Sequence, residues 1–142
     1  VASQPKHYAA YGSPVAGLNC APCAMSRHEV FTDSLPIFEE AVKEAGAMNV
    51  MCSYTCVGHV PVSMDHEILT EVLRDQWGFG GFVVTDYTGI YEMIAHGVGD
   101  FEQVSVQALK AGVDMDMVSE GFVVNVKNAL DKGLAGSSLY ST

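Results

Sequence analysis

The chain has 142 residues, of which 49% are apolar and 17% are charged, so one domain with a substantial core is expected. Its formal net charge of −10 argues against nucleic acid and anionic membrane as partners, and suits a soluble protein that acts on neutral ligands. No apolar run approaches the roughly 20 residues that a membrane-spanning helix needs.

The sequence predicts strands and helices in alternation. Residues 1–8 read as the end of a strand, and residues 11–25 form a Gly/Pro-rich loop that is long enough to be functional. The next helix is expected to be capped by Ser34 and to end at Gly46. Further strands are predicted at 49–53, 82–85 and 113–117, and helices at 67–77, 101–111 and 122–132. Residues 135–142 are expected to be a frayed tail.

The spacing of the strands indicates repeated βα units. Strand starts at 49, 82 and 113 are 33 and 31 residues apart, which favours parallel strands joined by right-handed crossovers. With residues 1–8 the chain has four such units. An open sheet of four parallel strands exposes two edges, whereas an eight-unit barrel has none. We therefore predict a single α/β domain over 1–142 that is half of a TIM-like (β/α)8 barrel.

The four cysteines leave several alternatives open. Cys20 and Cys23 have the CxxC spacing of a zinc knuckle or a redox pair. Zinc sites usually use two tight pairs, and Cys52 and Cys56 form a looser pattern, so zinc is the minor alternative. A Cys20–Cys23 disulfide is compatible with an oxidising compartment, and a buried free thiol is expected for Cys52. We expect neither a metal ion nor a cofactor.

The most informative segment is the apolar run 82–85, which ends on Asp86. Catalytic groups of α/β folds lie at the carboxyl ends of strands, so Asp86 is a candidate catalytic group. A turn or helix-capping aspartate is an equally weighted alternative. Polar or aromatic side chains and one methionine also lie at the strand ends, and a carboxylate among Lys, His and Tyr side chains suits a sugar site. These residues are Lys6, His7, Tyr8, Met51, Ser53, Tyr54, Tyr87, Asp114 and Asp116.

Each of these side chains also has a structural interpretation. Lys6 and His7 could be a solvated pair, and Met51 and Tyr54 could belong to the core. One of Asp114 and Asp116 could simply bond to loop backbone, and Asp114 is expected to be structural.

Six motifs carry a resemblance to a known family. Residues 6–12 (KHYAAYG) resemble the "KHF-x-x-YG" motif of family 3 glycoside hydrolases, the β-glucosidase and β-xylosidase group. Residues 35–42, 50–55, 69–79, 81–87 and 111–117 are similar, in the same order, to that family's "LPPFEAAV", "VMCSYN", "LLTDVLRNEWGF", "GFVVSDW" and "AGVDMDM". The resemblance therefore covers nearly the whole chain.

The resemblance implies a retaining glycosidase whose catalytic domain is a TIM-like barrel, with this chain as its second half. It implies that Asp86 is the nucleophile and that five further residues contact the sugar in the −1 subsite or lie beside it: Lys6, His7, Met51, Tyr54 and Tyr87. The implied substrates are β-linked glucosides, xylosides or oligosaccharides. The implied location is secreted or periplasmic.

The chain also departs from the family pattern. The family's acid/base is a Glu from a later domain, and its first-half strands carry a sugar-binding Asp and Arg; neither is expected here. Thr55 replaces the usual Asn, Ile37 replaces a Pro, and residues 17–20 stand where the family often has "GRDY". We therefore expect a weak or inactive glycosidase that needs the remainder of the enzyme or self-association. A non-catalytic half-barrel or dimerising scaffold is the alternative.

Overall fold

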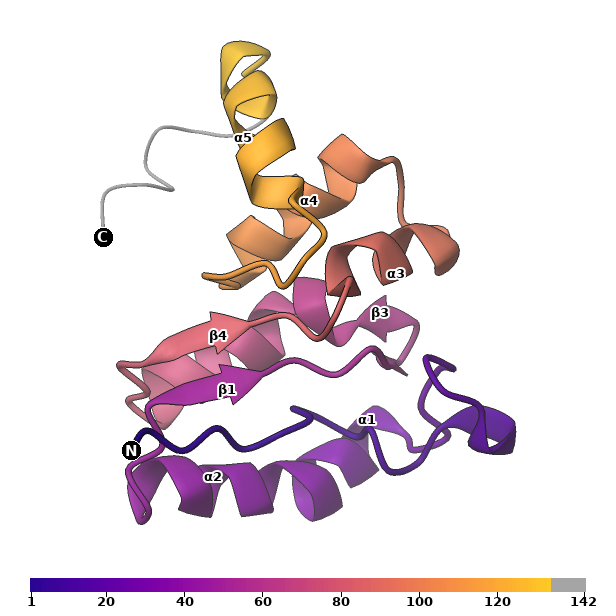
Figure 1. Ribbon diagram of the computed structural model, residues 1–142. Coiled ribbons are helices and arrows are strands. Elements are labelled where there is room, and N and C mark those ends of the chain that lie inside the picture. The colour runs from indigo at the N-terminus through magenta and orange to yellow at the C-terminus, as the bar shows by residue number, and fades with distance from the viewer. Residues whose placement is uncertain (134–142) are drawn as a thin grey trace.

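The structure is a computed structural model that describes residues 1–133, so the expected fraying of 135–142 lies outside the described residues. At its centre, strands β1 (Asn49–Met51) and β4 (Phe82–Val84) pair in parallel (Figure 1). Single parallel bridges add Tyr8 beside Cys52 on one side, and Met115 beside Val84 on the other. The predicted α/β fold with parallel strands is confirmed, in the order residue 8, β1, β4, residue 115.

Helices cover one face of this narrow sheet and flank both of its edges (Figure 1). In Figure 1, α2 lies beyond residues 1–8, η4 lies behind β1 and β4, and α3, α4 and α5 lie beyond β4. A short antiparallel hairpin of β2 (Cys56–Val57) and β3 (Val60–Pro61) follows β1. The helices are η1 (Val15–Gly17), α1 (Arg27–Glu29), η2 (Val30–Ser34), α2 (Leu35–Lys43), η3 (Val62–Met64), η4 (Glu67–Gln76), α3 (Gly89–Ala95), α4 (Phe101–Ala111) and α5 (Gly121–Asp131).

The predicted helices at 67–77, 101–111 and 122–132 are found within one residue at each end. The predicted cap at Ser34 is wrong, because the helical segment is capped by Ser26, eight residues before Ser34. Ser26 forms a capping box with Glu29, which satisfies the first free N–H groups of the helix. Ser34 lies inside the helical segment, and its Oγ accepts a hydrogen bond from the Ala10 N–H at 2.9 Å.

The last strand is much shorter than the predicted 113–117, since only Met115 pairs with β4. The carboxylate of Asp114 accepts hydrogen bonds from the Val83 N–H and from the Arg74 guanidinium, both at 2.6 Å. A side chain therefore takes the place of one ladder hydrogen bond, and this agrees with the structural interpretation of Asp114.

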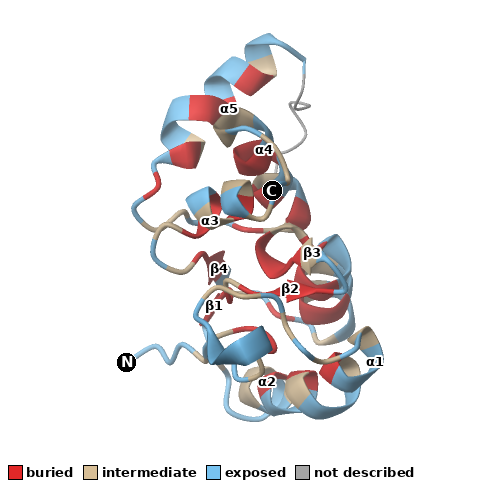
Figure 2. Cartoon of the chain, turned by 90° about the vertical axis from the view of Figure 1, so that its right-hand side faces the viewer, coloured by how far each residue is buried: buried red, intermediate tan, exposed pale blue. Residues whose placement is uncertain are grey.

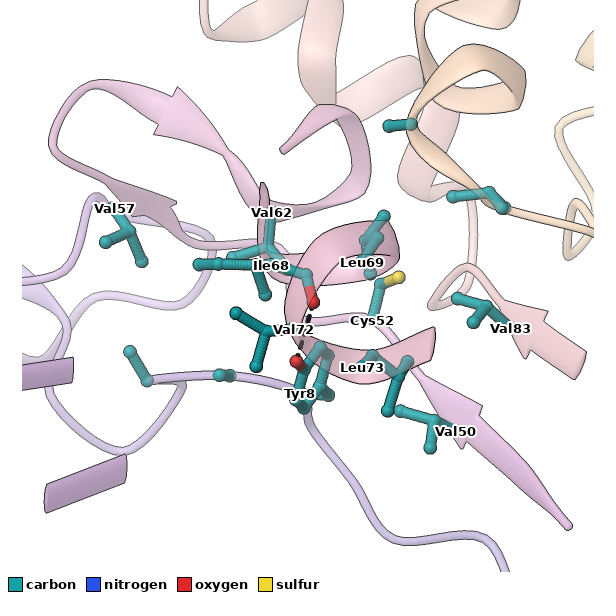
Figure 3. Packing of buried hydrophobic residues seen from close by; sticks show 14 of the residues in the cluster. Tyr8, Val50, Cys52, Val57, Val62, Ile68, Leu69, Val72, Leu73 and Val83 are labelled. Atoms are coloured by element: carbon teal, nitrogen blue, oxygen red, sulfur yellow. Dashed lines mark hydrogen bonds between the residues drawn. The ribbon is translucent and has the colours of Figure 1, made fainter. Parts of the chain in front are cut away.

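The main core lies between the sheet and η4 (Figure 3). Val50, Cys52 and Val83 of the strands are completely or almost completely buried near Leu69 and other apolar residues of η4. Full burial of one such aliphatic side chain contributes roughly 1.5–3 kcal/mol. This packing fixes which face of each strand points toward the helix.

Tyr8 joins this core to the first strand. Its ring is fully buried, and its hydroxyl donates a hydrogen bond to the Ile68 carbonyl at 2.8 Å (dashed in Figure 3). Its N–H donates to the Met51 carbonyl at 2.8 Å, and its own carbonyl accepts from the Ser53 N–H at 2.7 Å. Figure 2 shows the contrast along the chain, in which the first residues are exposed and the strands they lead to are buried.

The opposite face of the sheet is less covered. Successive strand residues point to opposite faces, and paired residues of parallel strands share a face. Met51, Val84 and Met115 therefore share one face, and Phe82 points the same way as Val84. Phe82 and Met115 are 43% and 51% exposed, which leaves apolar surface on this face of the described chain.

Candidate functional site

Asp86 lies just past the carboxyl end of β4 and faces the first strand segment. Its Oδ2 lies 3.2 Å from Nε2 of His7, and the two side chains are 14% and 22% exposed respectively. Its Oδ1 accepts a hydrogen bond from the Tyr87 N–H at 2.7 Å, and its backbone carbonyl accepts from the Gly89 N–H at 2.9 Å. One carboxylate oxygen is thus held by the turn that leads into α3, and the other faces His7.

Lys6 and His7 directly precede Tyr8, whose backbone hydrogen bonds to Met51 and Ser53 fix this segment beside β1. The Met51 N–H also donates to the Pro5 carbonyl at 3.3 Å, so backbone hydrogen bonds flank both residues. Burial lowers the pKa of His7 from its ordinary value; the charge of Asp86 opposes this decrease, and that of Lys6 adds to it. Lys6 is exposed and, with His7, lines a cavity of about 530 Å³.

Tyr54 reaches the same place from beyond the end of β1. Its hydroxyl donates a hydrogen bond to the Tyr87 carbonyl. Burial raises the pKa of Tyr54 well above its ordinary value, and the neighbouring carboxylate of Asp86 raises it further. The Tyr54 carbonyl lies 3.2 Å from Nε2 of His96, which follows α3. Tyr54 is therefore held between Asp86 and the end of α3.

The remaining two predicted site residues are placed differently. Tyr87 is 59% exposed, and its backbone contacts both Asp86 and Tyr54. Met51 is buried at the end of β1, on the sheet face opposite η4. This burial agrees with the alternative that Met51 belongs to the core. The structure thus brings His7, Tyr54 and Tyr87 to Asp86. Lys6 is next to His7 in the sequence. The structure describes no direct contact between Met51 and the Asp86 carboxylate.

Three residues near Asp86 were not predicted as site residues: Tyr11, Cys20 and Glu92. The Tyr11 ring centroid lies 4.3 Å from that of His7 and 6.2 Å from that of Tyr54. Burial raises the pKa of the Cys20 thiol, and the carboxylates of Glu92 and Asp86 raise it further. Tyr11 stands only four residues after His7, which is a usable sequence signal. Nothing in the sequence joins Cys20, in a loop, to Glu92, on α3.

The other candidate carboxylate and the cysteines have structural surroundings. Asp116 Oδ2 accepts a hydrogen bond from the Gly121 N–H at 2.6 Å, at the start of α5. All four cysteines are free thiols, and burial raises the pKa of Cys52 to about 12. Within residues 1–133, no three His, Cys, Asp or Glu side chains are grouped as a metal site would require. No helix in the same range has the length and apolarity to cross a membrane.

Comparison with known proteins places this arrangement in a family. The profile of the Glycosyl hydrolase family 3 N terminal domain matches residues 1–138. A periplasmic beta-glucosidase of Salmonella typhimurium is 40% identical over 81% of this chain, and a putative beta-xylosidase of Formosa agariphila is 37% identical over 81%. A mutant beta-glucosidase from Listeria innocua, solved in complex with laminaribiose, superposes with a TM-score of 0.91 at 29% identity over 97% of the chain.

The matches cover only part of each relative. The chain spans 15% of the Salmonella protein, 16% of the Formosa protein and 19% of the Listeria chain. Within that span the match runs through all four strand positions and through every residue around Asp86. The chain belongs to glycosyl hydrolase family 3.

Proposed function

We propose that Asp86 is the nucleophile of a retaining β-glycosidase site to which this chain contributes one wall. The observation that carries the proposal is the 3.2 Å approach of His7 to Asp86 at the carboxyl end of the parallel sheet. A carboxylate with one oxygen fixed by the backbone and the other facing an imidazole suits attack on an anomeric carbon.

The chemistry needs two carboxyl groups. Ionised Asp86 attacks the anomeric carbon, the glycosidic C–O bond breaks, and the leaving oxygen takes a proton from an acid about 5–5.5 Å from the nucleophile. Water, deprotonated by the same group, then cleaves the glycosyl-enzyme and releases Asp86. We assign the acid/base to the remainder of the enzyme rather than to this chain.

The neighbouring residues bind the sugar in this proposal. Lys6 donates hydrogen bonds to sugar hydroxyls, and His7, whose lowered pKa keeps it neutral near pH 7, both donates and accepts. Tyr54 and Tyr87 pack against the apolar face of the ring, and Met51 closes the floor of the pocket. The relatives are named for β-glucosides and β-xylosides, so the substrate class is a β-linked glucoside, xyloside or oligosaccharide.

The chain would form the second half of a TIM-like barrel. The exposed Phe82 and Met115 lie on the face opposite η4, where a barrel has its interior, and the sheet ends in single bridges on both sides. The missing half, or a second copy of the chain, would cover this face. Light scattering at high concentration tests the second option, and a monomer with little binding of an apolar dye would argue against it.

A chimera tests the catalytic assignment. This chain would replace the matching segment of the Salmonella beta-glucosidase, and hydrolysis of p-nitrophenyl β-glucoside would be measured. Asp86→Asn should lower kcat by a factor on the order of 10⁴, since loss of a nucleophile commonly costs this much. Asp75→Asn, on the exposed side of η4, is the matched control and should leave kcat unchanged.

Covalent trapping supplies an independent result. A 2-fluoro-glucoside should label Asp86 and no other carboxylate of the chimera, because the fluorine slows hydrolysis of the covalent intermediate. Near-full activity of Asp86→Asn, or a label on Asp116, would show that the nucleophile is misassigned. The isolated chain is expected to be weakly active or inactive in the same assay. An inactive wild-type chimera would favour the alternative of a non-catalytic half-barrel.

A further inference from the structure

Tyr11 occupies a central place in the site without a role in the scheme above. Its ring lies against the imidazole of His7, with centroids 4.3 Å apart and planes tilted by 42°. The ring also lies 6.2 Å from that of Tyr54. Its hydroxyl donates a hydrogen bond to the Asn19 side chain. One side chain therefore touches the histidine, the neighbouring tyrosine and the loop of residues 11–25.

The backbone before Tyr11 is firmly held. Residues 8–10 are buried, and the Ala10 N–H donates to Ser34 Oγ at 2.9 Å, which fixes the chain to the end of η2. The Ser13 N–H donates to the Ala10 carbonyl at 3.3 Å and closes a turn around Tyr11. Because the Tyr11 hydroxyl is bonded to Asn19, both ends of the side chain are anchored. A side chain anchored in this way loses little further conformational entropy when it restrains a neighbour.

The imidazole of His7 needs such a restraint. Its Nε2 meets Asp86 Oδ2 at 3.2 Å, and rotation about either side-chain torsion would move the nitrogen away. The phenol ring of Tyr11 is the aromatic contact of the imidazole within the described residues. Tyr11 also lines the 530 Å³ cavity with Lys6 and His7, and a second cavity of about 450 Å³ with Asn19 and Cys20. Tyr11, together with Gly12, therefore lines both cavities.

We propose that Tyr11 is a positioning residue, whose ring holds the imidazole of His7 toward Asp86 and whose hydroxyl ties the loop at Asn19 to the site. The importance of this role for catalysis rests on the proposed function. The geometry itself does not, so it can be measured on the isolated 142-residue chain.

Proton NMR of the aromatic signals gives the first test. The wild-type chain should show nuclear Overhauser effects between the rings of Tyr11 and His7, and an upfield ring-current shift of the His7 signals. Absence of both in the folded wild-type chain would overturn the proposal without any variant. Tyr11→Phe keeps the ring and should keep both signals. Tyr91→Leu removes an exposed ring that stacks on Phe101, and as the control it should leave His7 unchanged.

Titration of His7 gives the second test. The charged groups that act on His7 are Asp86 and Lys6, and neither is altered by a change at Tyr11. Asp86→Asn should lower the His7 midpoint in the wild type, because Asp86 raises the pKa of His7. In Tyr11→Leu, where the imidazole is no longer held toward the carboxylate, the same change should have a much smaller effect, and in Tyr11→Phe the full effect should return. An equally large effect of Asp86→Asn in Tyr11→Leu would contradict the positioning role.

Kinetics of the chimera connect the geometry to catalysis. Tyr11→Leu should lower kcat/KM by about 10²-fold, the loss expected when a reacting group is displaced by about 1 Å, and Tyr11→Phe should recover most of it. A fully active Asp86→Asn chimera would refute the proposed nucleophile, while the NMR results would still decide the role of Tyr11. An unaltered kcat/KM in Tyr11→Leu, with Asp86→Asn inactive, would refute only the catalytic importance of Tyr11.

Discussion

The contact between His7 and Asp86 allows a quantitative prediction for Asp86→Asn in the isolated chain. At the observed 3.2 Å, two unit charges attract by about 1.3 kcal/mol in water and about 5 kcal/mol at an effective dielectric constant of 20. The two side chains are mostly buried but not dry, so the true value lies between these limits. Because Asp86→Asn removes this attraction, which favours the protonated imidazole, it should lower the His7 pKa further below its ordinary value.

The measurement is an NMR titration of the His7 ring carbon-bound protons in both proteins. The shape of the side chain hardly changes, so the comparison isolates the charge. Asp75→Asn, which removes an exposed charge on η4, should leave the His7 midpoint where it is. A His7 midpoint that stays the same or rises in Asp86→Asn would mean that the carboxylate does not face the imidazole in solution.

The same change has a consequence for stability. The folded-state pKa of His7 is already depressed, so between that pKa and the ordinary value the unfolded chain binds the extra proton. Stability from this group is therefore present above pH 6.5 and decreases as the pH falls. Asp86→Asn widens this window, and in it the free energy of unfolding should fall by up to about 1.4 kcal/mol per pH unit. Urea unfolding at pH 5 and pH 8 measures the difference.

Three further predictions concern the core. Tyr8→Phe removes the buried hydrogen bond to Ile68 and should lower the free energy of unfolding by about 1 kcal/mol in urea titration; no loss would mean that water satisfies both groups in the wild type. Gly81→Ala would bring a Cβ into a steric clash with the Met48 carbonyl oxygen, so it should destabilise the chain by about 1–3 kcal/mol, and equal thermal midpoints would refute the clash. The buried Cys52 thiol, with its pKa near 12, should be alkylated by iodoacetamide only after unfolding; labelling in the native chain, detected by mass spectrometry, would contradict the packing.

Local patterns predicted three helices within one residue and the starts of the strands at 49 and 82, but they predicted the strand at 113–117 poorly. The helix at 101–111 is specified within its own sequence, by the Asp100 cap that bonds Gln103 and by its apolar spacing. The strand at 113–117 needs hydrogen bonds to β4, about 30 residues earlier in the chain. The N–H of Val83 in β4 donates to the Asp114 side chain instead of to a backbone carbonyl. Helix α3 was not predicted, because it begins after Thr88 in a left-handed conformation with no side-chain cap.

The β2–β3 hairpin was also missed, although it carried a signal. Gly58 and His59 both have positive φ and stand between two short apolar pairs, which is the pattern of a two-residue turn between antiparallel strands. Apolar periodicity over two residues is too short to detect, so only the turn residues could have revealed it.

The site could be predicted as far as strand ends define it. His7 and Asp86 end strand segments that lie on either side of β1, so parallel topology alone brings them to one end of the sheet. Tyr11, Cys20 and Glu92 approach through the conformation of a loop and the first helix after Asp86. No periodic pattern encodes that conformation, so Cys20 and Glu92 became visible only in three dimensions, and Tyr11 could have been found only from its closeness to His7 along the chain.

His7 and Tyr8 are adjacent in the sequence, yet one faces the pocket and the other is among the most deeply buried residues of the core. A substitution that loosens the packing of Tyr8 would therefore shift His7 directly, even in a chain that still folds. A variant library screened by activity would reject such substitutions together with true pocket defects. Because both kinds of variant fold, only a measurement of the position of His7 in the rejected variants would separate the two, and tolerance measured by activity alone would understate how freely this core can be redesigned.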